Sequence, residues 1–310
     1  MTTVVPTGPP TAEQPKAPGR AHRSRGTHSS YPTWFYLPAA AVYGVLFLVP
    51  TLASFYFSLT RWTIFKSTFI GLDNYTEFFQ EPALVKGFVN TFLYAVVTSG
   101  LKVVIGLALG ILLTSQIQAR GYLRSVVFFP VLVSTVGVGI TFTAFMDPST
   151  GAINKALATI GIDGPGWLTE PSLALFSVAL VDVWKGVGLA TVIYIAGIVS
   201  IPDEYYEAAK LDGAGAWQLL RNVVLPLSWP ATSTVIILSL IGGLRSFDLI
   251  WAMTRGGPGF SSDVVASVIY KQYQAGFYGL STAGNVILFL VVTAIIVPLS
   301  RFLARKEVQR

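Results

Sequence analysis

The chain has 310 residues, of which 53% are hydrophobic and 12% charged, and its formal net charge is +6. This composition is too apolar for an ordinary soluble domain of this length. The chain has no cysteine, which excludes disulfides, thiol catalysis and cysteine-based metal sites, and both of its histidines lie in the first 33 residues.

Residues 1–33 are rich in Pro, Gly, Thr, Ala and Arg and show no apolar periodicity. We predict a disordered cytoplasmic tail. A secretory signal is the alternative. The apolar run that begins at Trp34 continues to Leu59, however, which is the length of a membrane span rather than of a signal peptide.

Six apolar segments follow, and each is long enough to cross about 30 Å of hydrocarbon at about 1.5 Å per residue. We therefore predict an all-α membrane protein with one transmembrane domain over residues 34–306 and a cytoplasmic end at 307–310. Single prolines inside the segments are tolerable kinks in a lipid environment. The predicted spans cover residues 34–59, 91–115, 125–146, 173–201, 229–253 and 280–300.

The basic residues orient these spans. With the N-terminal tail inside, twelve of the 21 Lys and Arg residues fall in cytoplasmic segments, six in outer segments and three within spans. This excess predicts cytoplasmic termini. The basic tails are then topology determinants beside anionic lipid, and no nucleic-acid partner is expected. The outer connections 60–90 and 147–172 are predicted to be folded caps.

The connection at 202–228 is polar and lies on the cytoplasmic side in this topology. Asp203 is a plausible N-cap for a short helix, which Gly213 or Gly215 can end in a left-handed conformation. A second short helix is predicted over Ala216–Val224, after which Pro226 restarts the chain. On these features alone, a plain amphipathic connecting hairpin remains open.

The spacing within this loop is more specific. Glu207-Ala208-Ala209 is followed after three residues by Gly213, and then after nine residues by Val223 and by Leu225-Pro226. This pattern resembles the signature of bacterial ABC importer permeases, with Val223 where isoleucine is commoner. Other segments resemble the carbohydrate-uptake, maltose-type branch of that family, and together the resemblance covers residues 34–306. These segments are Ile70–Tyr75 with Phe78 and Phe79, Asn90-Thr91, Asp147–Asn154 and Thr254–Gly259.

The resemblance implies a type I importer permease in a bacterial plasma membrane that works with other subunits. A second permease, two ATP-binding subunits and an extracytoplasmic solute-binding protein are implied, with a sugar or oligosaccharide as the substrate. The chain lacks a G-x-x-x-x-G-K-[ST] motif, so ATP and Mg²⁺ are expected on the partner subunits and no cofactor on this chain. A permease for glycerol phosphate or another polar solute is the alternative.

The resemblance also implies roles in the 202–228 loop. Glu207 would anchor a coupling helix by a hydrogen bond, Ala208 and Ala209 would allow close contact with an ATPase, and Gly213 would make the turn. The pair Leu225-Pro226 completes the signature.

Five ionisable residues lie within the predicted spans, and each costs about 2.5–3.5 kcal/mol at the centre of a membrane helix. Measured along straight helices they lie about 8–18 Å from the outer ends, which suggests one polar cavity on a translocation path. Spacing by three residues would let Asp182 pair with Lys185 and Arg245 with Asp248. Ion pairs that only fix helix packing are the alternative. The proposed path residues are Lys102, Asp182, Lys185, Arg245 and Asp248, with Trp184 and Phe247 as aromatic surfaces for sugar rings.

Gly106 and Gly110 form a GxxxG pattern, which predicts close helix packing within the chain or against a partner permease. Two other classes of protein fit the sequence less well. An ion-coupled secondary transporter predicts internal repeats, and none is clear in the sequence. A membrane enzyme would need a catalytic set, and none is recognisable.

Overall fold

The computed structural model describes residues 33–63 and 65–308. Nearly all of the tail predicted over residues 1–33 therefore lies outside the described residues. The chain divides into two compact units, Met1–Val49 and Pro50–Arg310.

The first predicted span is helical over nearly its whole length. Helical structure runs without a break from Thr33 to Phe57, and its apolar side chains are mostly exposed, as those of a lipid-facing helix would be. The elements are η1 (Thr33–Tyr36), α1 (Leu37–Tyr43), the π-helical turn η2 (Gly44–Leu48) and α2 (Val49–Phe57).

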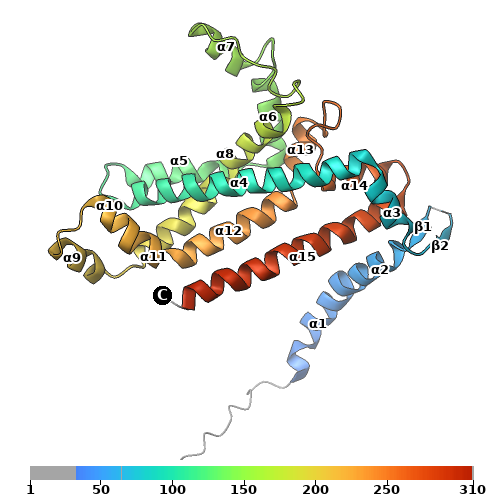
Figure 1. Cartoon of the computed structure of the whole chain (residues 1–310), viewed down its shortest axis with the longest axis horizontal. Helices are drawn as coiled ribbons and strands as arrows, with labels where there is room; N and C mark the ends of the chain where they lie inside the picture. The colour runs from blue at the N-terminus through green and yellow to red at the C-terminus, as the bar shows by residue number, and fades with distance from the viewer. Residues whose placement is uncertain (1–32, 64, 309–310) are drawn as a thin grey trace, which may run out of the picture. The chain divides into compact units, whose positions relative to one another are not determined.

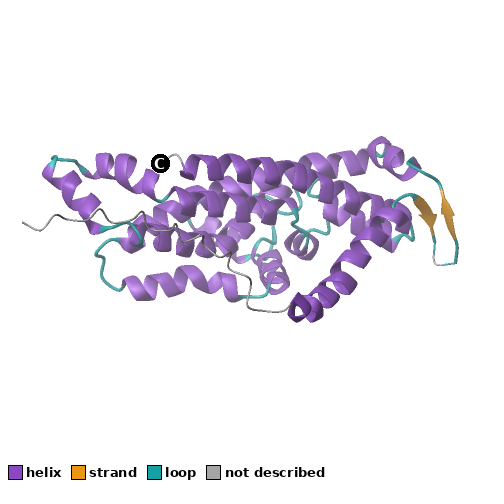
Figure 2. Ribbon diagram, turned by 90° about the horizontal axis from the view of Figure 1, so that it is seen from below, coloured by secondary structure: helices purple, strands orange, loops and turns teal. Residues whose placement is uncertain are grey.

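Four long helices form the core of the second unit and lie side by side in both views (Figures 1 and 2). Two of them exceed the predicted spans. α4 begins at Pro82 rather than Thr91, because proline suits the first turn of a helix. α15 continues to Val308 rather than ending at Ser300. The four helices are α4 (Pro82–Thr114), α8 (Ala174–Val199), α12 (Trp229–Leu244) and α15 (Tyr278–Val308).

Glycines set the close approach of α4 to α8. A Cβ added at Gly106 would lie 2.8 Å from the Cβ of Ala190, and one added at Gly110 would lie 2.7 Å from the Cβ of Tyr194. Both distances are too short for real side chains. The GxxxG pattern is therefore used within the chain, between α4 and α8, and not against a partner.

The third predicted span is not one straight helix. It consists of α5 (Arg120–Leu132) and α6 (Thr135–Phe145), which meet at 97°. Ser134 caps α6 by accepting a hydrogen bond from the Gly137 amide, and Pro130 lies inside α5 rather than at the break. The two halves also pack on different partners, since α5 contacts α8 while α6 contacts α13 (Asp248–Met253). Tertiary packing thus overrides the continuous hydropathy of residues 125–146.

The fifth predicted span is also broken. α12 ends at Leu244, and the chain leaves helical geometry over residues 245–247 before α13 begins at Asp248. At its other end, α12 bends by 67° from the helical segment Ala216–Leu227. The prediction of a continuous helix over 229–253 is therefore wrong at residues 245–247.

The predicted caps are folded. The connection 60–90 contains an antiparallel hairpin with Thr60 paired to Phe69, followed by a short helix, and a further helix, α14, lies between α13 and α15. The elements are β1 (Thr60–Trp62), β2 (Ser67–Phe69), α3 (Asp73–Gln80), α7 (Ala152–Thr159) and α14 (Val265–Gln274).

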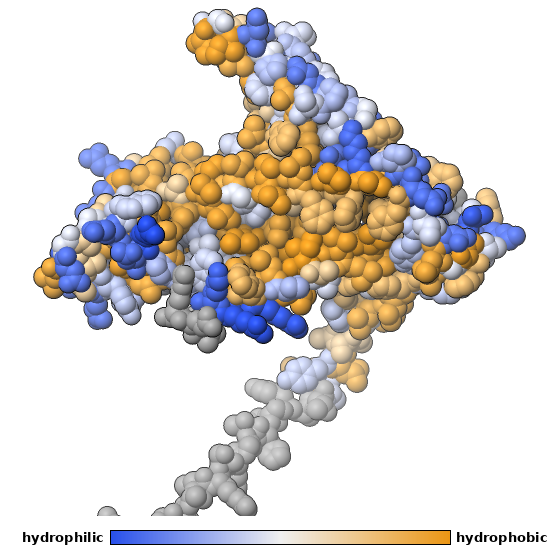
Figure 3. Space-filling model, in the orientation of Figure 1, coloured by the Kyte–Doolittle hydropathy of each residue, from blue (hydrophilic) through white to orange (hydrophobic). Residues whose placement is uncertain are grey.

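Apolar residues cover the visible face of the bundle between more polar ends (Figure 3). Four described helices are long and apolar enough to cross a membrane, and the number rises to six if each bent pair counts as one span. The fold is thus the predicted all-α membrane architecture, with two spans that are broken rather than straight.

Candidate functional site

The 202–228 loop folds into two short helical segments at one end of the bundle (Figure 1). Pro202 occupies the cap position, and Asp203 is the first residue of the helix, so the prediction that Asp203 is the N-cap is wrong by one residue. Gly213 has φ +73° and ends the first segment in the left-handed conformation, as predicted. The elements are α9 (Asp203–Leu211), α10 (Ala216–Leu219), the π-helical turn η3 (Leu220–Val224) and α11 (Leu225–Leu227).

This loop exposes an unusual set of side chains. Glu207 and Ala208 are exposed and Ala209 is half-buried. Two large apolar side chains are also exposed, Leu211 at 90% and Trp217 at 68%. Within the described part of the chain, the Glu207 carboxylate accepts no hydrogen bond. The loop is therefore a folded but uncovered surface, whereas Leu225 and Pro226 are half-buried at its base.

A cleft of about 640 Å³ separates α9 from the ends of α4 and α8, and Asp203, Tyr206 and Lys210 line its α9 side. Burial, with a smaller contribution from the Asp203 carboxylate, raises the pKa of the Tyr206 phenol above its ordinary value. The phenol is therefore neutral at physiological pH and remains available as a hydrogen-bond donor.

One of the predicted intramembrane charges is paired between helices. Lys102 Nζ of α4 donates a hydrogen bond of 2.7 Å to Asp182 Oδ2 of α8. Lys102 is buried, and the side chain of Asp182 is 23% exposed. The predicted Asp182–Lys185 pair is not formed among the described residues, because Asp182 faces α4 and takes its partner from there.

Small and polar neighbours shape this ion pair. A Cβ added at Gly186 would lie 2.9 Å from Lys102 Nζ, so the glycine leaves room for the ammonium group. The hydroxyl of the fully buried Tyr94 has Asp182 and Ser246 as its polar neighbours. The pair thus lies beside a buried hydroxyl group.

The break between α12 and α13 separates the other two predicted partners. Arg245 terminates α12 and Asp248 begins α13, and both side chains are exposed. Since they do not share a helix, the predicted spacing on one helical face does not apply, and no ion pair joins them in the described chain. Their depths along a straight helix are invalid for the same reason.

The predicted aromatic residues lie in two different clusters. Trp184 of α8 contacts Phe142 of α6, with ring centroids 5.1 Å apart, and is 45% exposed. Phe247 stacks on Trp251 at 5.7 Å, and both rings contact Tyr270 of α14. The structure therefore does not bring Trp184 and Phe247 into a single aromatic surface.

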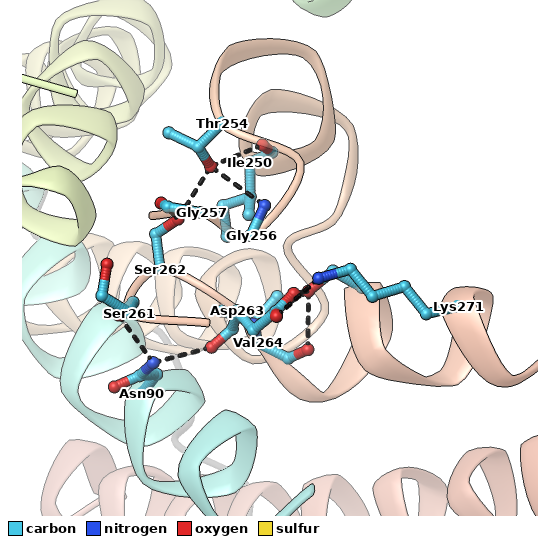
Figure 4. A network of polar contacts seen from close by, with 11 residues as sticks. Asn90, Ile250, Thr254, Gly256, Gly257, Ser261, Ser262, Asp263, Val264 and Lys271 are labelled. Atoms are coloured by element: carbon cyan, nitrogen blue, oxygen red, sulfur yellow. Dashed lines mark hydrogen bonds and ion pairs between the residues drawn. The ribbon is translucent and has the colours of Figure 1, made fainter. Parts of the chain in front are cut away.

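A second buried charge was not predicted from the sequence. Asp263 is fully buried, accepts a hydrogen bond of 2.6 Å from Lys271 Nζ and another from the Ser267 hydroxyl (Figure 4). An added Cβ at Gly256 would overlap the Asp263 carboxylate, so this glycine is required. The only signal in the sequence was the spacing of four residues from Asp263 to Ser267 and from Ser267 to Lys271, although Asp263 itself precedes α14.

A family model described as "Binding-protein-dependent transport system inner membrane component" matches residues 102–308, which is more than half of the chain. The chain belongs to this family.

Two curated relatives match most of this inner membrane component. The probable ABC transporter permease protein YurN of Bacillus subtilis is 32% identical over 88% of this chain and 97% of the relative. The trehalose/maltose transport system permease protein MalF of Thermococcus litoralis is 31% identical over 83% of this chain and 88% of the relative.

The fold matches a solved transporter subunit. A bacterial ABC transporter involved in the import of the acidic polysaccharide alginate superposes with a TM-score of 0.76 over 87% of this chain and 94% of that chain, at 24% identity. The fold of this inner membrane component is therefore that of an ABC importer permease.

Three buried asparagines of this permease hold neighbouring segments together by hydrogen bonds. Each side-chain amide donates two hydrogen bonds to carbonyl groups of a neighbouring loop. The acceptors are the backbone carbonyl oxygens of Ser58 and Thr60 for Asn74, of Ser261 and Asp263 for Asn90, and of Pro148 and Pro165 for Asn154.

Removing one of these asparagine side chains is expected to destabilise the permease. Asn90→Ala leaves two carbonyl groups without their buried donor, and we expect a loss of about 2–4 kcal/mol in the free energy of unfolding. Thermal unfolding in detergent micelles measures it. Asn222→Ala, at an exposed position whose side chain makes no hydrogen bond within the described residues, is the control and should unfold as the wild type does. Equal stability of both variants would contradict the role of Asn90.

The turn at Asp147 gives a pH prediction. Hydrogen bonds from the amide and hydroxyl groups of Thr150 and Ser149 hold the pKa of the Asp147 carboxyl at about 2, below its ordinary value of 3.8. Because this pKa is lower in the folded turn than its ordinary value, the ionised carboxylate stabilises the turn at pH values above about 4. This stabilisation is lost as the pH falls from about 4 through about 2. Amide-exchange protection at Thr150 should therefore be constant from pH 8 to 5 and fall below pH 3. Asp147→Ala should abolish it, whereas Asp163→Ala should not.

Proposed function

We propose that this chain forms one half of the transmembrane pore of an ATP-driven importer for a sugar or oligosaccharide. Membership of the binding-protein-dependent family and similarity to a trehalose/maltose permease support this function. The observation that carries the proposal is the exposed 202–228 loop, which is folded, bears the Glu-Ala-Ala signature and leaves Leu211 and Trp217 uncovered.

The loop docks on ATP-binding subunits in this proposal. Glu207 supplies an unused hydrogen-bond acceptor, Ala208 and Ala209 permit close approach, and Gly213 fixes the angle of the helix. ATP and Mg²⁺ are bound by those subunits and not by this chain. The loop and both termini then lie in the cytoplasm of a bacterial cell, which agrees with the distribution of basic residues.

The remaining partners follow from the same arrangement. A second permease completes the pore, and a solute-binding protein delivers the substrate to the opposite end, where α3, α14 and the β1–β2 hairpin lie (Figure 1). Closure of the paired ATPases would switch the pore between an inward-facing and an outward-facing state.

The Lys102–Asp182 pair marks the solute path in this proposal. Lys185, Arg245 and Asp248 are then further polar groups on the path, and Trp184 and Phe247 belong to two separate aromatic contacts. The alternative role of the ion pair is to fix the packing of α4 on α8. A glycerol-phosphate-type or other polar solute remains the second substrate class, since the five intramembrane charges sum to +1.

Substitutions in the loop test the coupling role. Glu207→Ala and Gly213→Val should each lower solute uptake at least about tenfold, and Gly213→Val should also lose the ATPase on purification in mild detergent, because valine disfavours positive φ. Glu204→Ala and Gly161→Val are matched controls; Gly161 also has a positive φ, +75°, with open space around it. Normal uptake and normal ATPase recovery in both loop variants would contradict the coupling role.

The energy source separates this proposal from a secondary transporter. Depletion of ATP should stop uptake, whereas collapse of the ion gradient at constant ATP should leave it unchanged. The opposite pattern would favour an ion-coupled carrier.

A further inference from the structure

Lys102 lines a small cavity between α4, α8 and α12. The cavity has a volume of about 110 Å³, and its wall is aliphatic except for Lys102, the Ser239 hydroxyl and the glycines at 186 and 242. Asp182 is not part of that wall. Lys102 therefore contributes to the cavity wall, with its ammonium group next to the lining residue Gly186, whereas its carboxylate partner does not line the cavity.

The hydrogen-bonding capacity of this ammonium group is only partly used. A lysine ammonium has three N–H donors, and within the described residues Lys102 Nζ makes a single hydrogen bond, to Asp182 Oδ2. The remaining donors belong to a lysine whose side chain as a whole is 10% exposed. A buried charge whose donors are unused is unfavourable until a ligand or water occupies them.

Two features of α8 fix the position of the ammonium group. Asp182 holds Nζ by one short bond, and the missing side chain of Gly186 provides the space in which Nζ lies, 2.9 Å from where a Cβ would stand. Gly242 of α12 also lines the cavity and would have no neighbour within 4 Å of an added Cβ, so space is free on the α12 side.

We infer that the Lys102 cavity is a subsite for an anionic oxygen of the transported solute. This inference rests on the proposed transport function and names the solute class, a sugar or similar polar solute that carries a carboxylate or phosphate group. A carboxylate or phosphate accepts charge-assisted hydrogen bonds from Lys102 and an ordinary one from Ser239. The aliphatic remainder of the wall offers no partners for the several hydroxyl groups of a neutral ring, and the cavity suits a small charged group rather than a whole ring.

The absence of native cysteine permits a direct test of the local electrostatic potential. Ser239→Cys and Gly242→Cys each place one thiol on the cavity wall of the full permease. The rates of modification by anionic sulfonatoethyl and cationic trimethylammonioethyl methanethiosulfonate are measured for each, relative to free cysteine. We expect the anionic reagent to be favoured. Lys102→Met should lower the anionic-to-cationic rate ratio about tenfold or more, and Asp182→Asn should raise it.

Matched controls separate this effect from loss of structure. Lys155→Met, on the exposed helix α7, should leave the ratio unchanged. A structural defect changes the rates of both reagents together, whereas a charge effect moves them in opposite directions. An unchanged ratio in Lys102→Met would overturn the inference, and so would failure of both reagents to reach both thiols, because a solute subsite must open to water.

Protection by small solutes identifies the anionic group. Glucuronate supplies a carboxylate, sn-glycerol 3-phosphate supplies a phosphate, and glucose is the neutral control. If either anion slows modification of the thiols, and this protection is lost in Lys102→Met, the subsite is supported. The anion that protects shows whether the subsite takes a carboxylate or a phosphate. Equal protection by glucose would overturn it. ATP-dependent uptake that persists without any such protection would leave the proposed transport function intact while removing the subsite.

Discussion

Gly106→Leu is expected to destabilise the permease core severely. The space beside Gly106 cannot hold even a Cβ, which would lie 2.8 Å from the Cβ of Ala190, so a leucine must push α4 away from α8. We expect a loss of at least about 3 kcal/mol in unfolding free energy. Because Lys102 lies one turn away on α4, the ion pair with Asp182 would also separate. Size-exclusion chromatography and thermal unfolding in detergent measure the effect.

The same helix provides a matched control. Gly100 also lies within α4, is exposed, and would have no atom within 4 Å of an added Cβ. Gly100→Leu should fold normally and gain a little helix propensity. If both leucine variants behave alike, close packing of α4 on α8 is not what constrains position 106.

Breaking the Lys102–Asp182 pair from either side should destabilise the permease, and removing both charges should restore it. Lys102→Met leaves a partly buried carboxylate unpaired, and Asp182→Asn leaves a buried ammonium group unpaired. Each should cost about 2–4 kcal/mol, while the double variant should recover most of the loss, since a paired buried charge contributes little net stability.

A thermodynamic cycle in detergent measures the coupling energy of this pair. Lys185→Met is the control, because Lys185 lies on the same helix as Asp182 but has no ion-pair partner among the described residues. Additive losses in the double variant would contradict a direct interaction. The readout is stability alone, so it does not depend on the solute or on the partner subunits.

The hydropathy of the sequence was sufficient to predict the helices that cross the bundle as single units. α8 fills the predicted span 173–201 almost completely, and the 202–228 loop contains the two predicted short helices. Of the two glycines predicted as possible ends of the first helix, Gly213 is the one with a positive φ. These features are encoded locally, by apolar run length and by one residue that tolerates a positive φ.

The broken spans could not be predicted in this way. Residues 125–146 contain no charge, and residues 229–253 are apolar apart from a few polar residues and the charged Arg245 and Asp248. Hydropathy does not show that α6 packs on α13 while α5 packs on α8. Ser134 was the one local signal, since serine is a favoured N-cap. The pairing of Lys102 with Asp182 was missed for a related reason, because spacing along one helix carries no information about a charge on the neighbouring helix.

The right-angle turn at Ser134 also constrains how the protein is made. α5 has 13 residues, which at about 1.5 Å per residue span about 20 Å, less than the roughly 30 Å hydrocarbon layer. The segment 120–145 leaves the ribosome before α8 and α13, whose surfaces hold its two halves apart. The bend at Ser134 therefore acquires all of its packing partners only after synthesis has passed Met253. The final shape of this segment thus depends on residues that are synthesised after it.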